Sequence, residues 1–144
     1  MKETMRWTLS VWILVIAFDL SIILSMWVAL DLRITLIAFC AVALATGWIY
    51  KTSALTIEIT EKTLRADRAE IEFSCIKSVA ALTKEEMRNA RGRDADVRAF
   101  LALRFWVHTG IKVALNDPHD PTPYWLISSR KNKEFAQLLG KKIT

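Results

Sequence analysis

Two long apolar runs fill most of the first fifty residues and restrict the folds open to this chain. The first run, residues 9–30, holds one charged side chain, Asp19, and the second run, residues 34–50, holds none. Both lie within the roughly 17–25 residues that an α-helix needs to cross the hydrocarbon core of a bilayer. No small-residue cleavage site precedes the second run, so the first is expected to be a retained helix and not a signal peptide. The sequence predicts a transmembrane hairpin over residues 1–52.

The charges flanking the two runs predict the orientation of the hairpin, whose helices are expected at about residues 8–30 and 33–50. The short link between the runs holds one Asp and one Arg, whereas the outer ends carry the basic residues Lys2, Arg6, Lys51, Lys62, Arg65 and Arg68. Basic residues near helix ends favour the cytoplasmic side. We therefore expect a multi-pass protein of the cell inner membrane, with both termini and the soluble domain in the cytoplasm.

Asp19 lies near the middle of the first run, where a charge costs roughly 2.5–3.5 kcal/mol on insertion scales. Counting back from the turn places Thr46 and Gly47 at about the same depth on the second run. Thr46 is suited to donate a hydrogen bond to Asp19, and Gly47 would allow close approach. Three interpretations stay open: a bond within the hairpin, a contact with another subunit, and a proton or ion site.

Residues 53–144 are expected to form one small α+β domain, because alternation of apolar and polar residues over 55–59 is typical of a half-buried strand. Thr83 and Glu86 match a capping box, which predicts a helix over residues 84–91. An amphipathic helix is expected over 133–139, with Phe135 inward. Further short strands are expected at residues 64–66, 71–73, 76–82, 99–107, 111–115 and 124–129. This plan, a small antiparallel barrel plugged by a terminal helix, is that of pleckstrin-homology-like domains.

Two stretches carry a resemblance to a known family. They are Asp96-Val-Arg-Ala-Phe-Leu-Ala-Leu-Arg-Phe-Trp106 and Asp117-Pro-His-Asp-Pro-Thr-Pro-Tyr-Trp-Leu-Ile-Ser-Ser-Arg130. The chain resembles a family of small uncharacterised actinobacterial membrane proteins with a two-helix hairpin and a C-terminal domain of unknown function. Its Ile-Ser-Ser-Arg ending before a helix is also similar to bacterial pleckstrin-homology-like domains. The resemblance implies this architecture and no particular activity.

The net charge of +5 arises entirely after Tyr50, because basic and acidic residues balance before it. A nucleic-acid-binding domain clusters its charge more tightly, so no nucleic-acid partner is expected. Two basic clusters are either solvated faces or contacts with anionic lipid headgroups or an acidic partner. The first comprises Arg88, Arg91 and Arg93, and the second Arg130, Lys131 and Lys133.

Candidate catalytic chemistry is sparse, and no cofactor is expected. Asp117, His119 and Asp120 lie too close together in sequence for easy tetrahedral metal binding, so we interpret them as a turn that accepts backbone hydrogen bonds. Ser128 and Ser129 occupy no nucleophile elbow, and the four glycines form no phosphate-binding loop. We expect a protein that is not an enzyme.

The sequence favours a membrane-anchored interaction module, most simply an accessory subunit docked on a larger inner-membrane complex, with respiratory-chain complexes the first to test. Asp19, Trp106, Tyr124 and Trp125 are the expected partner-contact residues, the last three lying in the domain core or at its binding edge. Two alternatives remain. One is an adaptor that binds a soluble partner along a strand edge. The other is an enzyme or small transporter using Asp19 or the Asp117–Asp120 loop.

Overall fold

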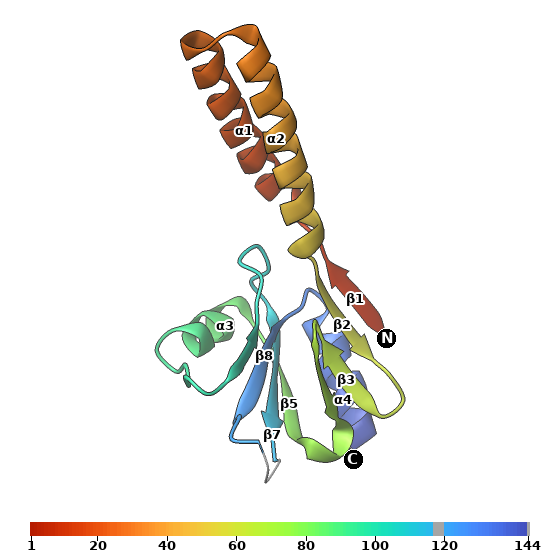
Figure 1. Cartoon of the computed structure of the whole chain (residues 1–144). Helices are drawn as coiled ribbons and strands as arrows, with labels where there is room; N and C mark the ends of the chain where they lie inside the picture. The colour runs from red at the N-terminus through yellow and green to blue at the C-terminus, as the bar shows by residue number, and fades with distance from the viewer. Residues whose placement is uncertain (117–119, 144) are drawn as a thin grey trace. The chain divides into compact units, whose positions relative to one another are not determined.

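The computed structural model describes residues 1–116 and 120–143 and divides into two compact units. Arg6–Ala54 form one unit, and Met1–Met5 together with Leu55–Thr144 form the other. The predicted α+β class is confirmed: two apolar helices are followed by an antiparallel sheet, a mixed sheet and a C-terminal helix (Figure 1).

The first unit is a hairpin of two long helices, α1 (Leu9–Ala29) and α2 (Leu32–Thr52). Asp31 starts α2, because its carboxylate accepts hydrogen bonds from the backbone N–H groups of Arg33 and Ile34, at 2.9 and 3.1 Å. Both helices are long and apolar enough to cross a membrane, and Thr35 is the one buried residue in either of them. Their apolar side chains are thus exposed along almost the whole hairpin.

Aromatic side chains gather at the open end of the hairpin. The ring of Trp7 packs edge-on against those of Trp12 and Tyr50, with centroids 5.1 and 5.4 Å away. The indole N–H of Trp7 donates a hydrogen bond to the Ser53 hydroxyl at 2.7 Å. Amphipathic rings with one satisfied polar atom are typical of membrane–water interfaces.

The second unit contains two four-stranded sheets. In the first, β1 (Lys2–Met5), β2 (Leu55–Ile59), β3 (Thr63–Ala66) and β4 (Ala69–Glu72) run antiparallel in that order. A short 3₁₀ helix, Phe73–Cys75, leads into the second sheet. Its order is β5 (Ile76–Leu82), β7 (Gly110–Leu115), β8 (Tyr124–Ser128) and β6 (Phe100–Ala102).

Two helices complete this unit, α3 (Lys84–Arg91) and α4 (Asn132–Ile143). The predicted capping box of α3 is confirmed: the Glu86 N–H donates to the Thr83 hydroxyl, and the Thr83 N–H donates to the Glu86 carboxylate at 2.8 Å. The hydrogen bonds that the Thr83 N–H and the Thr83 hydroxyl donate to the Glu86 carboxylate lower the pKa of Glu86. Phe135 and Leu139 of α4 are fully buried in a core that draws side chains from both sheets.

The sequence does not predict the strand β1. The hairpin is predicted over residues 1–52, but Met1–Met5 belong to the globular unit. Lys2–Met5 is short and largely polar, and its pairing with β2 joins residues at least fifty positions apart. Such non-local pairing leaves no periodic signal in the strand itself.

The predicted strand over residues 99–107 is wrong beyond Ala102. The strand β6 ends there and runs parallel to β8, so it forms no hairpin with β7. The N–H of Arg104 donates to the Ser128 hydroxyl at 3.0 Å, and that of Val107 to the Arg104 carbonyl at 3.0 Å, which turns the chain out of the sheet. The strand was predicted too long because the residues of this turn are also apolar.

Candidate functional site

Asp19 of α1 and Thr46 of α2 lie side by side in the hairpin. The Thr46 hydroxyl donates a hydrogen bond to the Asp19 carboxylate at 2.9 Å, and both residues are half-buried. The predicted bond within the hairpin is therefore confirmed. The close approach predicted at Gly47 is not present, because no atom lies within 4 Å of a Cβ built there. Gly47 instead faces outward on α2.

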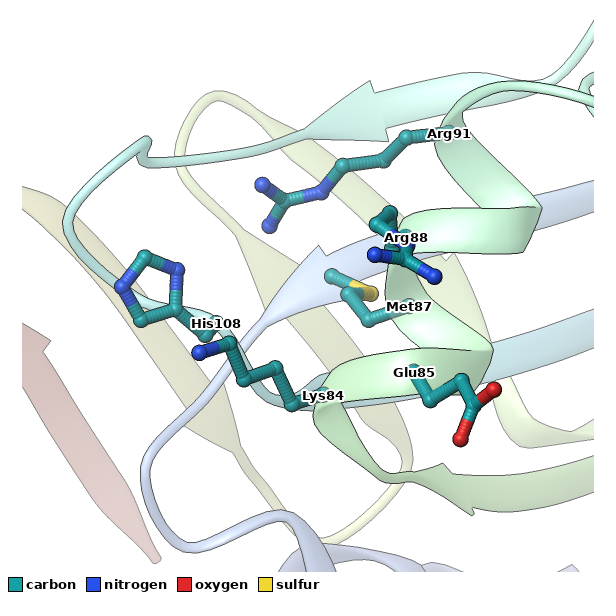
Figure 2. A pocket seen from close by; sticks show the side chains of 6 residues that line it. All are labelled: Lys84, Glu85, Met87, Arg88, Arg91 and His108. Atoms are coloured by element: carbon teal, nitrogen blue, oxygen red, sulfur yellow. The ribbon is translucent and has the colours of Figure 1, made fainter.

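In the globular unit, three basic side chains share one face of α3. Lys84, Arg88 and Arg91 follow an i, i+4, i+7 spacing, which places them in a row along a helix. With Glu85, Met87 and His108 they line a surface hollow of about 500 Å³, drawn in Figure 2. His108 comes from the turn before β7, and Met87 is buried beneath the helix. We call this feature the α3 hollow.

Arg91 is the most constrained cation of the α3 hollow. One Nη2 atom donates to the Val107 carbonyl at 3.0 Å and to the Ser128 hydroxyl at 3.2 Å. The Nε atom is buried without a hydrogen-bond partner among the residues that the structure describes. Burial lowers the pKa of Arg91, since desolvation disfavours the charged form. An arginine nevertheless keeps its charge in proteins, so the hollow contains a fixed positive charge.

Arg93, the third residue of the first predicted basic cluster, lies outside the α3 hollow. Arg93 follows the end of α3, is exposed, and forms an ion pair with its neighbour Asp94 at 3.2 Å.

The second predicted basic cluster lies at the start of α4 and is accompanied by carboxylates. Glu3 of β1 accepts hydrogen bonds from the Ser129 hydroxyl at 2.6 Å and from the Arg130 N–H at 3.1 Å. The Lys131 ammonium lies 3.7 Å from Glu134, and Lys133 is exposed. This cluster is therefore partly neutralised within the fold.

The structure places the predicted contact aromatics mainly in the core. Tyr124 and Trp125 of β8 are buried, and the Tyr124 hydroxyl accepts a hydrogen bond from the Asp96 N–H at 3.0 Å. Trp106 is half-buried and packs against the core. Phe105 was not among the predicted contact residues. It is 71% exposed, and its ring packs edge-on against that of Trp106, with centroids 4.8 Å apart.

In the loop before β8, Asp120 acts as expected of a turn residue. Its carboxylate accepts a hydrogen bond from the Thr122 N–H at 2.8 Å, and the bonds to Thr122 lower the pKa of Asp120. Asp117 and His119 lie outside the described residues. Over residues 1–116 and 120–143, no group of three His, Cys, Asp or Glu side chains is arranged to hold a metal ion.

A family model described as "Protein of unknown function (DUF3093)" matches residues 1–139 of the chain. The chain belongs to the DUF3093 family. This membership fits the predicted resemblance to an uncharacterised family. No curated protein and no solved structure matches this DUF3093 protein.

The sequence of this DUF3093 protein predicted two cations of the α3 hollow, Arg88 and Arg91, but not Lys84 or His108. The spacing of Lys84 relative to Arg88 on a correctly predicted helix was sufficient to add Lys84 to the cluster. Nothing in the sequence indicated His108, because its position depends on how the chain turns after β6.

Proposed function

We propose that this DUF3093 protein is a non-catalytic accessory subunit, anchored in the cell inner membrane by α1 and α2, with both termini and the globular unit in the cytoplasm. One observation carries the proposal: two helices of membrane-spanning length bury almost nothing of their apolar surface. In water such surface would be strongly unfavourable, whereas lipid tails or neighbouring helices would cover it.

The Asp19–Thr46 pair supports docking against other membrane helices. The single bond from Thr46 leaves most of the hydrogen-bonding capacity of Asp19 unused, since a carboxylate has about four lone-pair sites. A carboxylate at mid-membrane is costly unless partners satisfy it. A donor on another subunit would fill this need, and the outward-facing Gly47 beside Thr46 would let a second helix approach. We propose respiratory-chain complexes as the first partners to test. We also propose that the protein comes from an actinobacterium.

We also propose that the globular unit is a variant of the pleckstrin-homology-like plan, covering a cytoplasmic face of the complex. Two four-stranded sheets and a terminal helix that buries Phe135 and Leu139 support this assignment. Two features depart from a purely antiparallel barrel: β1 comes from ahead of the hairpin, and β6 runs parallel to β8. Its basic surface is proposed to contact anionic headgroups without specificity, and no nucleic-acid partner is proposed.

A stand-alone adaptor is the second candidate, because β6 is an edge of its sheet. Around this edge, Val97 is fully exposed, Leu101 is 51% exposed, and Phe105 is also largely exposed. An extended peptide adding to β6 would cover these side chains.

Replacing the intramembrane carboxylate tests the accessory-subunit proposal. Asp19→Asn is expected to weaken assembly by about 1 kcal/mol, roughly fivefold in the association constant, because an amide cannot supply the same charge-assisted acceptor. The fraction of protein in a high-mass band on native gels of mild-detergent membranes measures this loss. Ser25→Ala, at a hydroxyl that bonds only to the backbone of its own helix, is the control.

Two results would count against the accessory-subunit proposal. The native protein running alone, as monomer or homodimer, favours the adaptor. An unchanged high-mass band in Asp19→Asn, together with a weakened one in Thr46→Val, would assign Asp19 to the internal hairpin bond alone.

A further inference from the structure

We propose that the α3 hollow is a binding site for a single phosphate group, held by Lys84, Arg88 and His108 beside the fixed guanidinium of Arg91. The phosphate would be carried by a lipid headgroup or by a soluble phosphate ester. This inference extends the non-specific headgroup contact proposed above into a discrete site.

The basic side chains that line the α3 hollow come from two parts of the fold, the helix α3 and the segment before β7. Figure 2 shows Lys84 and Arg91 reaching from opposite ends of α3 toward the turn that carries His108, with Met87 between them. The carboxylate of Glu85 points away from this group. A volume of about 500 Å³ is ample for one phosphate and its ester substituent.

The positive charge in the α3 hollow is not neutralised by the fold. In the described part of the chain, no carboxylate lies within ion-pair distance of Lys84, Arg88 or Arg91. The cluster at the start of α4 differs in this respect, because Lys131 pairs with Glu134. The guanidinium of Arg91 is half-buried and has no counter-charge among the described residues, so a bound anion would stabilise it.

The type and number of donors favour phosphate over a carboxylate. A carboxylate is satisfied by one guanidinium in a two-bond pair, whereas a phosphate dianion offers three or four oxygens to several donors at once. The α3 hollow supplies an ammonium group, a guanidinium fork and an imidazole around one space, beside the second guanidinium. Lys84, Arg88 and His108 are all exposed, so their side chains can close on an incoming anion without disturbing the core.

The test uses the full chain in nanodiscs of neutral phosphatidylcholine, titrated calorimetrically with inorganic phosphate and with dihexanoyl phosphatidic acid. The native protein is expected to bind at least one probe saturably, at one site. The double variant Lys84→Ala/Arg88→Ala is expected to bind at least about tenfold more weakly, because it loses two charge-assisted interactions. His108→Ala is expected to lose about threefold.

A matched control separates a site from general attraction. Lys131→Ala/Lys133→Ala removes the same net charge from the other cluster and is expected to change affinity by less than about twofold. Absence of saturable binding in the native protein, or equal losses in the two double variants, would overturn the phosphate site. Neither outcome would affect the accessory-subunit proposal, which is measured by complex assembly.

Comparison of the two probes identifies the source of the phosphate. If phosphatidic acid binds more tightly than inorganic phosphate, and Phe105→Ala removes this difference, the site is assigned to a lipid headgroup. Phe105 is the residue to test because it is exposed and lies three residues before His108. Equal binding of both probes, unchanged in Phe105→Ala, assigns it to a soluble phosphate. Both results support the site.

Discussion

Gly110→Ala is expected to destabilise the globular unit by about 3 kcal/mol, near the upper end of the usual cost of overpacking a core. Gly110 begins β7 and pairs with both Leu82 of β5 and Ser128 of β8. A Cβ built on it collides with the carbonyl oxygen of Ile127 and with the terminal methyl of Met87. The methyl can rotate away, but the carbonyl belongs to a strand fixed on both sides, so the sheet itself must open.

Thermal and denaturant unfolding of the full chain in detergent, followed by near-ultraviolet circular dichroism, measures this loss. The buried Tyr124 and Trp125 report on packing next to the altered strand. Gly140→Ala is the matched control, because no neighbouring atom lies within 4 Å of a Cβ there. Gly140 lies inside α4, in its last turn, where that change is expected to stabilise by up to roughly 0.5–1 kcal/mol. Equal stability of the two variants would show that the packing around Gly110 is looser than described.

Phe135→Ala is expected to cost about 3–5 kcal/mol, the range for emptying the site of a buried aromatic side chain. Phe135 is fully buried on α4 and belongs to the core that includes residues of both sheets. Removing the ring leaves a cavity between these sheets that their hydrogen-bonded strands cannot close. With a typical domain stability of about 5–15 kcal/mol, the variant is expected to be partly unfolded at growth temperature.

The same unfolding measurement applies to Phe135→Ala, with Leu138→Ala as its control on the same helix. Leu138 is 39% exposed, so its truncation is expected to cost less than about 1 kcal/mol. A loss of similar size in both variants would mean that α4 does not plug the core as the structure shows.

Local signals in the sequence predicted the helices well. Composition alone indicates α1 and α2, and the Thr83–Glu86 capping box marks the beginning of α3 to the residue. The pairing of Asp19 with Thr46 followed from counting helix depth from the turn, because a short link fixes two helices as antiparallel neighbours.

Non-local features were beyond the reach of the sequence. The strand β1 forms only because β2 follows the hairpin, and the parallel pairing of β6 with β8 depends on the connection through β7. The candidate site follows the same division. Arg88 and Arg91 were predicted as members of one basic cluster, and helical spacing could have added Lys84, whereas His108 joins them only after the whole sheet has formed.

The central claim is that α1 and α2 span the inner membrane and leave the globular unit in the cytoplasm. Two single-cysteine chains, made after Cys40→Ser and Cys75→Ser, test it by labelling with a membrane-impermeant maleimide in spheroplasts. Leu30→Cys lies between the helices, and Gln137→Cys lies on the exposed side of α4. The proposal predicts that Leu30→Cys is labelled in intact spheroplasts and that Gln137→Cys is labelled only after the membrane is opened. Labelling of Gln137→Cys in intact spheroplasts, or release of the protein from membranes by alkaline carbonate, would contradict it.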